Sequence, residues 1–357
     1  MTADQSDLFE DKRDQYLEIL SPLFFPRDPL SHDIIRFFSS VLRVAGMEDK
    51  GWDPQLESRA VLNDKNLLMK LDLSIADFPD GLTTWRLGLL LYSHILEMSA
   101  PYEVIANLLR FRIGEGFSPN PFYKYMNDDE RKRFKKSGLF PKQKIGIIKM
   151  LSEKAQLPVG DIFDEFVDFD LRNAISHSDF VIVDEDFRIR GHSLSKYKSI
   201  PLIDLDYKIT AAKAFASAFF IAEREMRKTW GMNAGRAIPY DPHYKALMEV
   251  LANEEGLMIG FKVHWPNGED SYYRRTQEGV EMVNCFLSLE KETVELFVGM
   301  YAINPGTFSP LVEHNALAVY SVLEGSDESV VWDNSAATAK QKLLPEVNLG
   351  GRSNRPS

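Results

Sequence analysis

Hydrophobic residues recur at steps of three and four through the first two thirds of the chain, a spacing that predicts a mainly helical region. The segment DLFEDKRDQYLEIL predicts one helix and HDIIRFFSSVLRVAGM another, which is expected to end near Gly46. The longest periodic stretch, TWRLGLLLYSHILEMSAPYEVIANLLRFRIG, contains Pro101. Because proline interrupts a helix, we expect two helices here, the second capped by Ser99.

The periodicity changes after His177. The segment GDIFDEFVDFDLRNAISH keeps its apolar residues on one stripe and predicts a single amphipathic helix, with Asp161 as its N-cap. The alternation of FVIV and FRIR around DED then predicts a β-hairpin. A last long helix is expected from Asp206 to Trp230.

Beyond this helix the composition shifts toward strands. GMNAGRAIPYDPHY has the glycine and proline content of a linker, and the turn signal Asn267-Gly268 joins two strand-like runs. ETVELFVGMYAI is expected to form a helix and ALAVYSVL a strand. We therefore predict a mainly α-helical bundle with a short β-hairpin, followed by a small C-terminal α+β domain. The expected parts are an N-terminal helical segment over 1–80, a helical domain over 81–232, a linker over 233–243, the α+β domain over 244–345 and a flexible tail over 346–357.

The composition narrows the functional classes. The 357 residues carry a net charge of −11, so any contact with a polyanion must come from a local basic patch. The single cysteine, Cys285, excludes an internal disulfide and a cysteine-based zinc site. The acidic start has no apolar core of signal-peptide length, and no segment reaches the roughly 20 apolar residues of a spanning helix. We expect a cytoplasmic protein that does not enter the membrane.

The stretch FDLRNAISHSDF places Arg172, Asn173 and His177 close together on a predicted helix. Asn173 and His177 are four residues apart and share a face, whereas Arg172 and His177 lie about 140° apart around the axis. A long arginine side chain can bridge that angle, so the guanidinium and the imidazole can converge on one ligand. Two other Arg–His pairs of similar spacing are interrupted by prolines and cannot lie within a regular helix.

The motif LRNAISH resembles the Arg-polar-x-x-x-His signature of HEPN domains, helical bundles found widely in prokaryotic defence and toxin systems. The hairpin after the motif, the long closing helix and the preceding YSHILEMSAPYEVIANLLR also resemble bacterial HEPN proteins, so the likeness covers roughly residues 80 to 230. HEPN domains are often metal-independent endoribonucleases that act as dimers, with two motifs meeting at one composite site. The resemblance implies an RNA substrate, a homodimer, no metal ion and no other cofactor. It also implies products with a 2′,3′-cyclic phosphate and a 5′-hydroxyl.

The residue types suit that chemistry. Attack of an RNA 2′-hydroxyl on its own phosphate needs proton transfer, which a histidine can perform near neutral pH. It also needs a cation for the charge of the phosphorane, and arginine is a permanent, forked phosphate ligand. His177 and Arg172 are the candidates for these two roles. Asn173 would orient the imidazole or hold a phosphate oxygen.

A structural interpretation stands beside the catalytic one. Asp168 lies four residues before Arg172, where the two would form an ordinary helical ion pair, and His177 could simply cap the C-terminus of its helix. The competing function is a non-catalytic HEPN-like module for dimerisation, for nucleotide binding or for control by an antitoxin or another regulatory partner. The acidic residues around the motif also make a poor surface for a polyanion; they are Asp161, Asp164, Glu165, Asp168 and Asp170.

Residues 131 to 150 hold eight lysines and arginines and no acidic residue, with Phe134 and Phe140 between them. Phosphates attract the cations and bases stack on the rings, so this segment is a candidate RNA contact, although a solvated basic helix is the simpler interpretation. The candidate RNA-binding residues are Arg131, Lys132, Arg133, Lys135, Lys136, Lys142 and Lys144.

Two further histidines carry weaker signals. His94 and Glu97 lie three residues apart in SHILE, a spacing that some metal-binding bundles use. A buried His94 hydrogen-bonded to Glu97, or a supporting contact with His177, is the simpler expectation. His264, in KVHWPNG, is expected to have a structural role.

Overall fold

The computed structural model divides into two compact units, each assembled from separate stretches of the chain. One unit comprises Met1–Leu23, Pro54–Ile113 and Phe122–Ala222, and the other comprises Phe24–Asp53, Gly114–Pro121 and Glu223–Ser357. The boundaries expected from the sequence follow chain order, so they do not anticipate that residues 24–53 group with the C-terminal strands. The structure describes residues 3–26, 34–43, 54–70, 82–118, 120–190, 197–235, 237–241, 246–264, 270–275, 280–283, 285–288 and 293–296.

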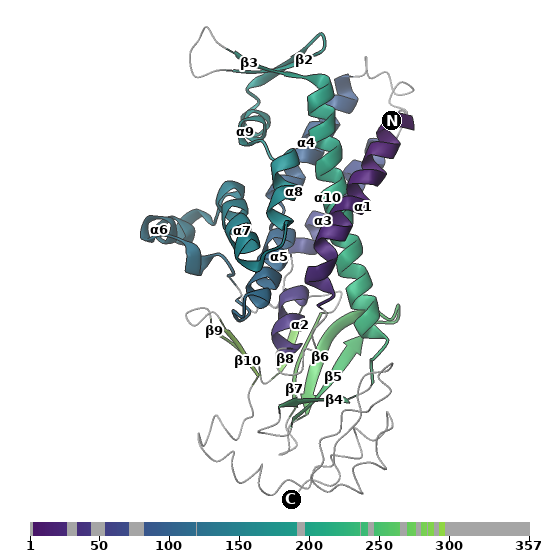
Figure 1. Cartoon of the computed structure of the whole chain (residues 1–357), viewed down its shortest axis with the longest axis vertical. Coiled ribbons are helices and arrows are strands. Elements are labelled where there is room, and N and C mark those ends of the chain that lie inside the picture. Colours follow the sequence, from purple (N-terminus) through teal and green to yellow (C-terminus); the bar gives the residue numbers. More distant parts are fainter. Residues whose placement is uncertain are drawn as a thin grey trace, which may run out of the picture. The chain divides into compact units, whose positions relative to one another are not determined.

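The first unit is mainly helical, as the hydrophobic periodicity predicts (Figure 1). Its helices are α1 (Ala3–Phe24), α3 (Pro54–Leu68), α4 (Leu82–Glu97), α5 (Ser99–Arg112), α6 (Asp128–Ser137), α7 (Pro141–Ala155), α8 (Val159–Phe166), α9 (Phe169–His177) and α10 (Leu202–Gly231), which continues past Ala222 into the second unit. A short 3₁₀ helix at Tyr123–Tyr125 precedes α6. None of the helices within the described residues combines the length and the apolar character that crossing a lipid bilayer requires.

The long helical stretch divides at Met98 rather than at Pro101. Met98 is the N-cap residue of α5 and makes no side-chain capping bond, so the expected cap at Ser99 is not formed. Pro101 lies in the first turn of α5, where a missing N–H is tolerated. The hydroxyl of Ser99 instead accepts a hydrogen bond from Lys144 Nζ at 2.8 Å, which ties α7 to the start of α5.

An aromatic cluster lies in the core of the first unit. The ring centroids of Phe163, Phe166 and Phe215 are 5.2, 5.5 and 6.0 Å apart, and Tyr102 packs against Phe163 at 5.8 Å. All four side chains are fully buried. Rings of this size bury more apolar surface than other side chains, and paired rings add a further attraction. Because Phe163 and Phe166 belong to α8, the cluster fixes the helix that precedes the candidate motif.

A three-stranded antiparallel sheet follows α9. The hairpin that the alternating pattern predicts is confirmed, and a third strand, not predicted, extends it in the order β1-β2-β3. One face is apolar and buried through Phe187, Ile189 and Ile200, whereas the opposite face leaves Val181 and Tyr197 exposed. The strands are β1 (Phe180–Val183), β2 (Asp186–Arg190) and β3 (Tyr197–Pro201).

The second unit is built on a five-stranded antiparallel sheet with the order β4-β5-β6-β7-β8. Helix α2 packs against β6, where the ring of Phe38 lies 6.3 Å from that of Phe261 and 4.9 Å from that of Trp230. The elements are α2 (Ile34–Leu42), β4 (Ala237–Asp241), β5 (Ala246–Ala252), β6 (Met258–His264), β7 (Asp270–Arg275) and β8 (Val280–Val283), with a separate pair formed by β9 (Cys285–Ser288) and β10 (Thr293–Leu296).

Two expectations for this region differ from the structure. The expected linker contains β4, an edge strand that tolerates Pro239 because a residue at the edge need not donate to the ladder. The expected helix ETVELFVGMYAI contains β10, which pairs with β9 and whose Thr293 and Val294 are β-branched. The Asn267-Gly268 turn, the predicted strand ALAVYSVL and the predicted tail over 346–357 lie outside the described residues.

Candidate active site on helix α9

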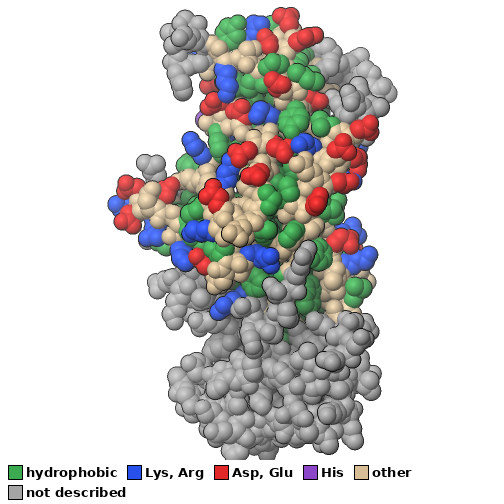
Figure 2. Space-filling view, in the orientation of Figure 1, with side chains coloured by type: hydrophobic (Ala, Val, Ile, Leu, Met, Phe, Trp, Pro, Cys, Tyr) green, Lys and Arg blue, Asp and Glu red, His purple; other side chains and the backbone are tan. Residues whose placement is uncertain are grey.

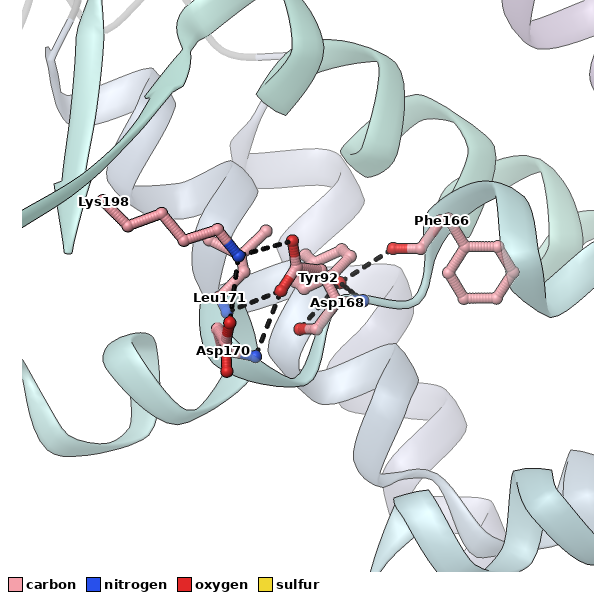
Figure 3. Close-up of polar contacts among 6 residues, drawn as sticks. All are labelled: Tyr92, Phe166, Asp168, Asp170, Leu171 and Lys198. Atoms are coloured by element: carbon pink, nitrogen blue, oxygen red, sulfur yellow. Dashed lines mark hydrogen bonds and ion pairs between the residues drawn. The ribbon is translucent and has the colours of Figure 1, made fainter. Parts of the chain in front are cut away.

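The predicted motif lies on α9, a helix of nine residues that is separate from α8. The sequence predicts one helix over both, but the chain breaks between them, and Asp168 rather than Asp161 caps the motif helix. Oδ1 of Asp168 accepts hydrogen bonds from the backbone N–H groups of Asp170 at 3.1 Å and Leu171 at 3.0 Å (Figure 3). Aspartate competes with the backbone for such donors, so it favours a helix start over a helix interior.

Tyr92 of α4 fixes the break between the two helices (Figure 3). Its hydroxyl donates to the carbonyl oxygen of Phe166 at 2.9 Å and accepts from the N–H of Asp168 at 3.0 Å. Burial raises the pKa of Tyr92, so the hydroxyl keeps its proton for this contact. From the other side, Lys198 of β3 pairs with Asp170 at 3.0 Å and with Asp168 at 3.7 Å. The start of α9 is thereby held by both α4 and β3.

Arg172 is held across the helix interface by Glu97, the last residue of α4. Its Nε lies 2.5 Å from Oε1 of Glu97, and its Nη2 faces the same oxygen. Its Nη1 donates to Oδ1 of Asn173 at 3.0 Å. The structural interpretation expects Arg172 to pair with Asp168. Instead, Arg172 pairs with Glu97 of α4. A guanidinium has five N–H donors, and these contacts leave two of them for a ligand.

His177 is the last residue of α9, and its side chain is exposed. It makes no side-chain hydrogen bond or ion pair with any other residue that the structure describes. Ser178 adopts the left-handed conformation with a φ of 57°, and the N–H groups of Ser178 and Asp179 donate to the carbonyls of Ile175 and Ala174. Because the backbone closes the helix in this way, the imidazole is not needed as its cap.

Most of the acidic run around the motif is paired with lysines. Lys149 pairs with Asp164, Lys12 contacts Glu165 at 2.5 Å, and Lys198 pairs with both Asp168 and Asp170. Figure 2 accordingly shows acidic and basic side chains interspersed over the described part of the face that it presents. The motif helix therefore presents less uncompensated negative charge to an anion than the sequence alone indicates.

His94 and Glu97 do not pair with each other. Nε2 of His94 lies 2.8 Å from the carbonyl oxygen of Ser58 on α3, and burial lowers the pKa of His94, which favours the neutral imidazole. The supporting contact therefore comes from Glu97 alone and reaches Arg172 rather than His177. In the part of the chain that the structure describes, no group of three or more His, Cys, Asp or Glu side chains is placed to hold a metal ion.

The candidate RNA-binding residues lie on α6 and α7, and they differ in their contacts and exposure. Arg131 turns back onto the carbonyl oxygens of Tyr123 and Lys124, and Lys144 is engaged by Ser99. The side chains of Arg133, Lys135 and Lys136 lie outside the described residues.

Lys132 and Lys142 are exposed, and Nζ of Lys132 lies 3.4 Å from Oδ1 of Asp129. Nζ of Lys142 lies 6.0 Å from the ring centroid of Phe169, the first residue of α9. The start of the basic helix α7 is therefore next to the start of the motif helix α9.

The role of Glu165 is not visible in the sequence. Its Oε2 accepts hydrogen bonds from Lys12 and Tyr16 of α1 at 2.5 and 2.9 Å and from Tyr207 of α10 at 2.9 Å. Burial acts to raise the pKa of Glu165, but the hydrogen bonds outweigh it, and the pKa lies below its ordinary value. Because Lys12 is 153 residues away, no local pattern predicts this junction of α1, α8 and α10.

Replacing Glu165 by glutamine is expected to lower the free energy of unfolding near pH 7 by about 1–3 kcal/mol, because hydrogen bonds to a charged acceptor are lost. Since the folded-state pKa is lowered, the carboxylate stabilises the fold above the ordinary pKa, and the effect is lost as the pH falls through the folded-state pKa. Urea unfolding at about pH 7 and about pH 3 measures this. A difference between wild type and variant that stays constant with pH would contradict the charged role.

His264 of the second unit is buried between two carboxylates. Its Nδ1 lies 3.1 Å from Oδ1 of Asp270 and its Nε2 lies 2.9 Å from Oε2 of Glu249, and Asp270 also pairs with Lys262 at 3.0 Å. The imidazole is 1% exposed. It joins β5, β6 and β7 and cannot reach a substrate, which agrees with the structural role that the sequence predicts.

Comparison of the chain with protein-family models, with curated proteins and with solved structures found no match in any of the three. The likeness of LRNAISH to HEPN motifs therefore remains a resemblance of sequence. What the structure brings together is Arg172, Glu97 and Asn173, with an exposed His177 at the end of the same helix.

Proposed function

We propose that this chain is a metal-independent endoribonuclease with an HEPN-like helical domain, in which Arg172 and His177 carry out the transesterification of RNA. The observation that carries the proposal is the contrast between two residues of one short helix. The guanidinium is oriented by two partners, while the imidazole is exposed and makes no hydrogen bond with another described residue. An oriented phosphate ligand and an accessible proton-transfer group are what this reaction requires.

In the proposed reaction the 2′-oxygen bonds to the adjacent phosphorus and the bond from phosphorus to the 5′-oxygen breaks. The imidazole of His177 takes the proton of the 2′-hydroxyl, and the protonated imidazole of a second copy donates a proton to the leaving 5′-oxygen. The products carry a 2′,3′-cyclic phosphate and a 5′-hydroxyl. Two imidazoles in one site require two copies of the motif, and for this reason we propose a homodimer.

Arg172 would bind the phosphate whose charge grows in the transition state. Its two remaining N–H donors can bind two phosphate oxygens. The contacts with Glu97 and Asn173 orient the guanidinium already in the absence of RNA. Asn173 would therefore orient the guanidinium rather than the imidazole. Lys132 and Lys142 would attract the RNA backbone toward α9.

A non-catalytic function is the second candidate, and the Glu97–Arg172 ion pair favours it. The arginine side chain is 20% exposed, so its contact with Glu97 can serve to join α4 and α9. The exposed end of α9 would then bind a second copy, a nucleotide, or an antitoxin or other regulatory partner. The resemblance to HEPN proteins suggests a cytoplasmic setting in antiviral defence or a toxin system for either candidate.

Incubation of the purified chain with single-stranded RNA in excess EDTA tests the proposal. We expect endonucleolytic fragments whose ends, analysed by mass spectrometry, carry a 2′,3′-cyclic phosphate and a 5′-hydroxyl. Cleavage that EDTA abolishes, or fragments with 3′-hydroxyl ends, would contradict the mechanism. A folded chain that cleaves no RNA would instead support the non-catalytic candidate.

A further inference from the structure

The outer face of the β1-β2-β3 sheet carries a cluster that the proposed reaction does not use. Arg188 pairs in register with Ser199 and Arg190 with Tyr197, so Arg188, Arg190 and Tyr197 all point to the same face. The guanidinium of Arg188 lies 5.2 Å from the centroid of the Tyr197 ring. Since the opposite face holds the buried residues, these three side chains are not part of the core.

The cluster is open to solvent and only partly neutralised. Tyr197 is 62% exposed, and the side chain of Arg190 is 67% exposed at 3.8 Å from Asp179. Arg188 lies 3.5 Å from Asp186, and its Nε is buried without a hydrogen-bond partner among the residues that the structure describes. The Arg188 side chain is 30% exposed, and its exposed part could bind a phosphate oxygen.

The cluster lies at the end of the sheet where the chain leaves α9. The N–H of Arg190 donates to the carbonyl oxygen of Asp179 at 3.1 Å, and Asp179 is two residues beyond His177. Helix α9 packs against β2 from the opposite, buried face, where Lys198 reaches Asp168 and Asp170. The cluster therefore meets the end of α9 at Arg190, and a nucleic-acid strand that leaves His177 past Asp179 would reach Arg190 first.

We propose that Arg188, Arg190 and Tyr197 form a sheet platform that binds single-stranded RNA beside the scissile phosphate. A base stacks on the exposed part of the Tyr197 ring, and the two arginines bind phosphates. A duplex keeps its base faces stacked inside, so the platform selects unpaired nucleotides. The inference deepens the proposed function and rests on it for the identity of the ligand.

Binding of an oligonucleotide that cannot be cleaved tests the platform separately from catalysis. The probe is a fluorescent, fully 2′-O-methylated single strand, and fluorescence anisotropy gives its Kd. Tyr197→Ala is expected to weaken binding about tenfold, the effect of losing one stacked base, and Tyr197→Phe is expected to stay within about twofold because it keeps the ring. Arg190→Gln should lower the slope of log Kd against log salt by about 0.7, the effect of one phosphate contact.

Ile203→Ala serves as the control, because Ile203 is exposed at the start of α10 and outside the platform. If Tyr197→Ala and Arg190→Gln bind the probe as tightly as wild type, with the same salt dependence, the inference is overturned, even if wild type cleaves RNA in EDTA. Weakened binding by the variants of a chain that cleaves nothing supports the platform and overturns the nuclease. If wild type does not bind the probe, the platform is overturned, and a protein partner becomes the candidate ligand of this sheet face. If Tyr197→Ala fails to fold, the salt dependence of Arg190→Gln decides alone.

Discussion

Replacement of His177 by alanine is expected to lower the rate of RNA cleavage by about 10²–10⁴-fold, the usual contribution of general acid–base catalysis. The side chain is exposed at the end of α9 and makes no hydrogen bond within the described part of the chain. Its loss should therefore change the free energy of unfolding by less than about 0.5 kcal/mol. The single-turnover rate in excess EDTA and a thermal unfolding curve measure the two effects.

Two further variants make this result specific. Ser176→Ala is the matched control, because Ser176 is the exposed neighbour of His177 on the same turn and has no proposed role. Arg172→Lys keeps a positive charge but loses the fork that Glu97 and Asn173 orient, and it should reduce the rate at least about tenfold. A His177→Ala variant that cleaves at the wild-type rate would remove His177 from the mechanism.

Replacement of Phe215 by alanine is expected to lower the free energy of unfolding by about 3–5 kcal/mol. Its ring is fully buried and contacts Phe163 at 5.2 Å and Phe166 at 5.5 Å, so truncation leaves a cavity among rings that cannot all move together. Urea unfolding followed by far-UV circular dichroism measures the loss, because the helices of the first unit dominate that signal.

Phe140→Ala is the matched control for the core variant. Phe140 is exposed at the N-cap of α7, and its truncation should change the free energy of unfolding by less than about 0.5 kcal/mol. If Phe215→Ala and Phe140→Ala are equally mild, the aromatic cluster is not what holds α8 in place. The cluster would then not explain the position of the motif helix either.

The sequence predicts the elements of the first unit where the signal is local. The periodicity of α4, α5 and α10 and the alternation of β1 and β2 depend on residues close together in the chain. Local periodicity does not predict the break between α8 and α9, because the break depends on Tyr92, which lies 76 residues before Asp168. The expected linker likewise contains strand β4, since a short edge strand is defined by its partner β5 rather than by its own residues.

In the candidate site, too, the sequence predicts what depends on nearby residues and not what depends on distant ones. Residue type and helical phase single out Arg172, Asn173 and His177, but they cannot show which acid holds the arginine. Asp168, the acid four residues before Arg172, is used as a cap, and Glu97, 75 residues away, pairs with the arginine instead. The sequence does not predict the sheet platform for a similar reason, because Tyr197 joins Arg188 and Arg190 only through the pairing of β2 with β3.

The most direct test uses a DNA strand that contains one ribonucleotide, incubated with the wild-type chain in excess EDTA. Transesterification by a 2′-hydroxyl predicts a single cut on the 3′ side of that ribonucleotide, with a 2′,3′-cyclic phosphate at the new end. The same strand with a 2′-O-methyl group at that position should stay intact. Cutting at deoxynucleotides, or equal cutting of the methylated strand, would show that the attacking group is not the 2′-hydroxyl and would contradict the proposed role of Arg172 and His177.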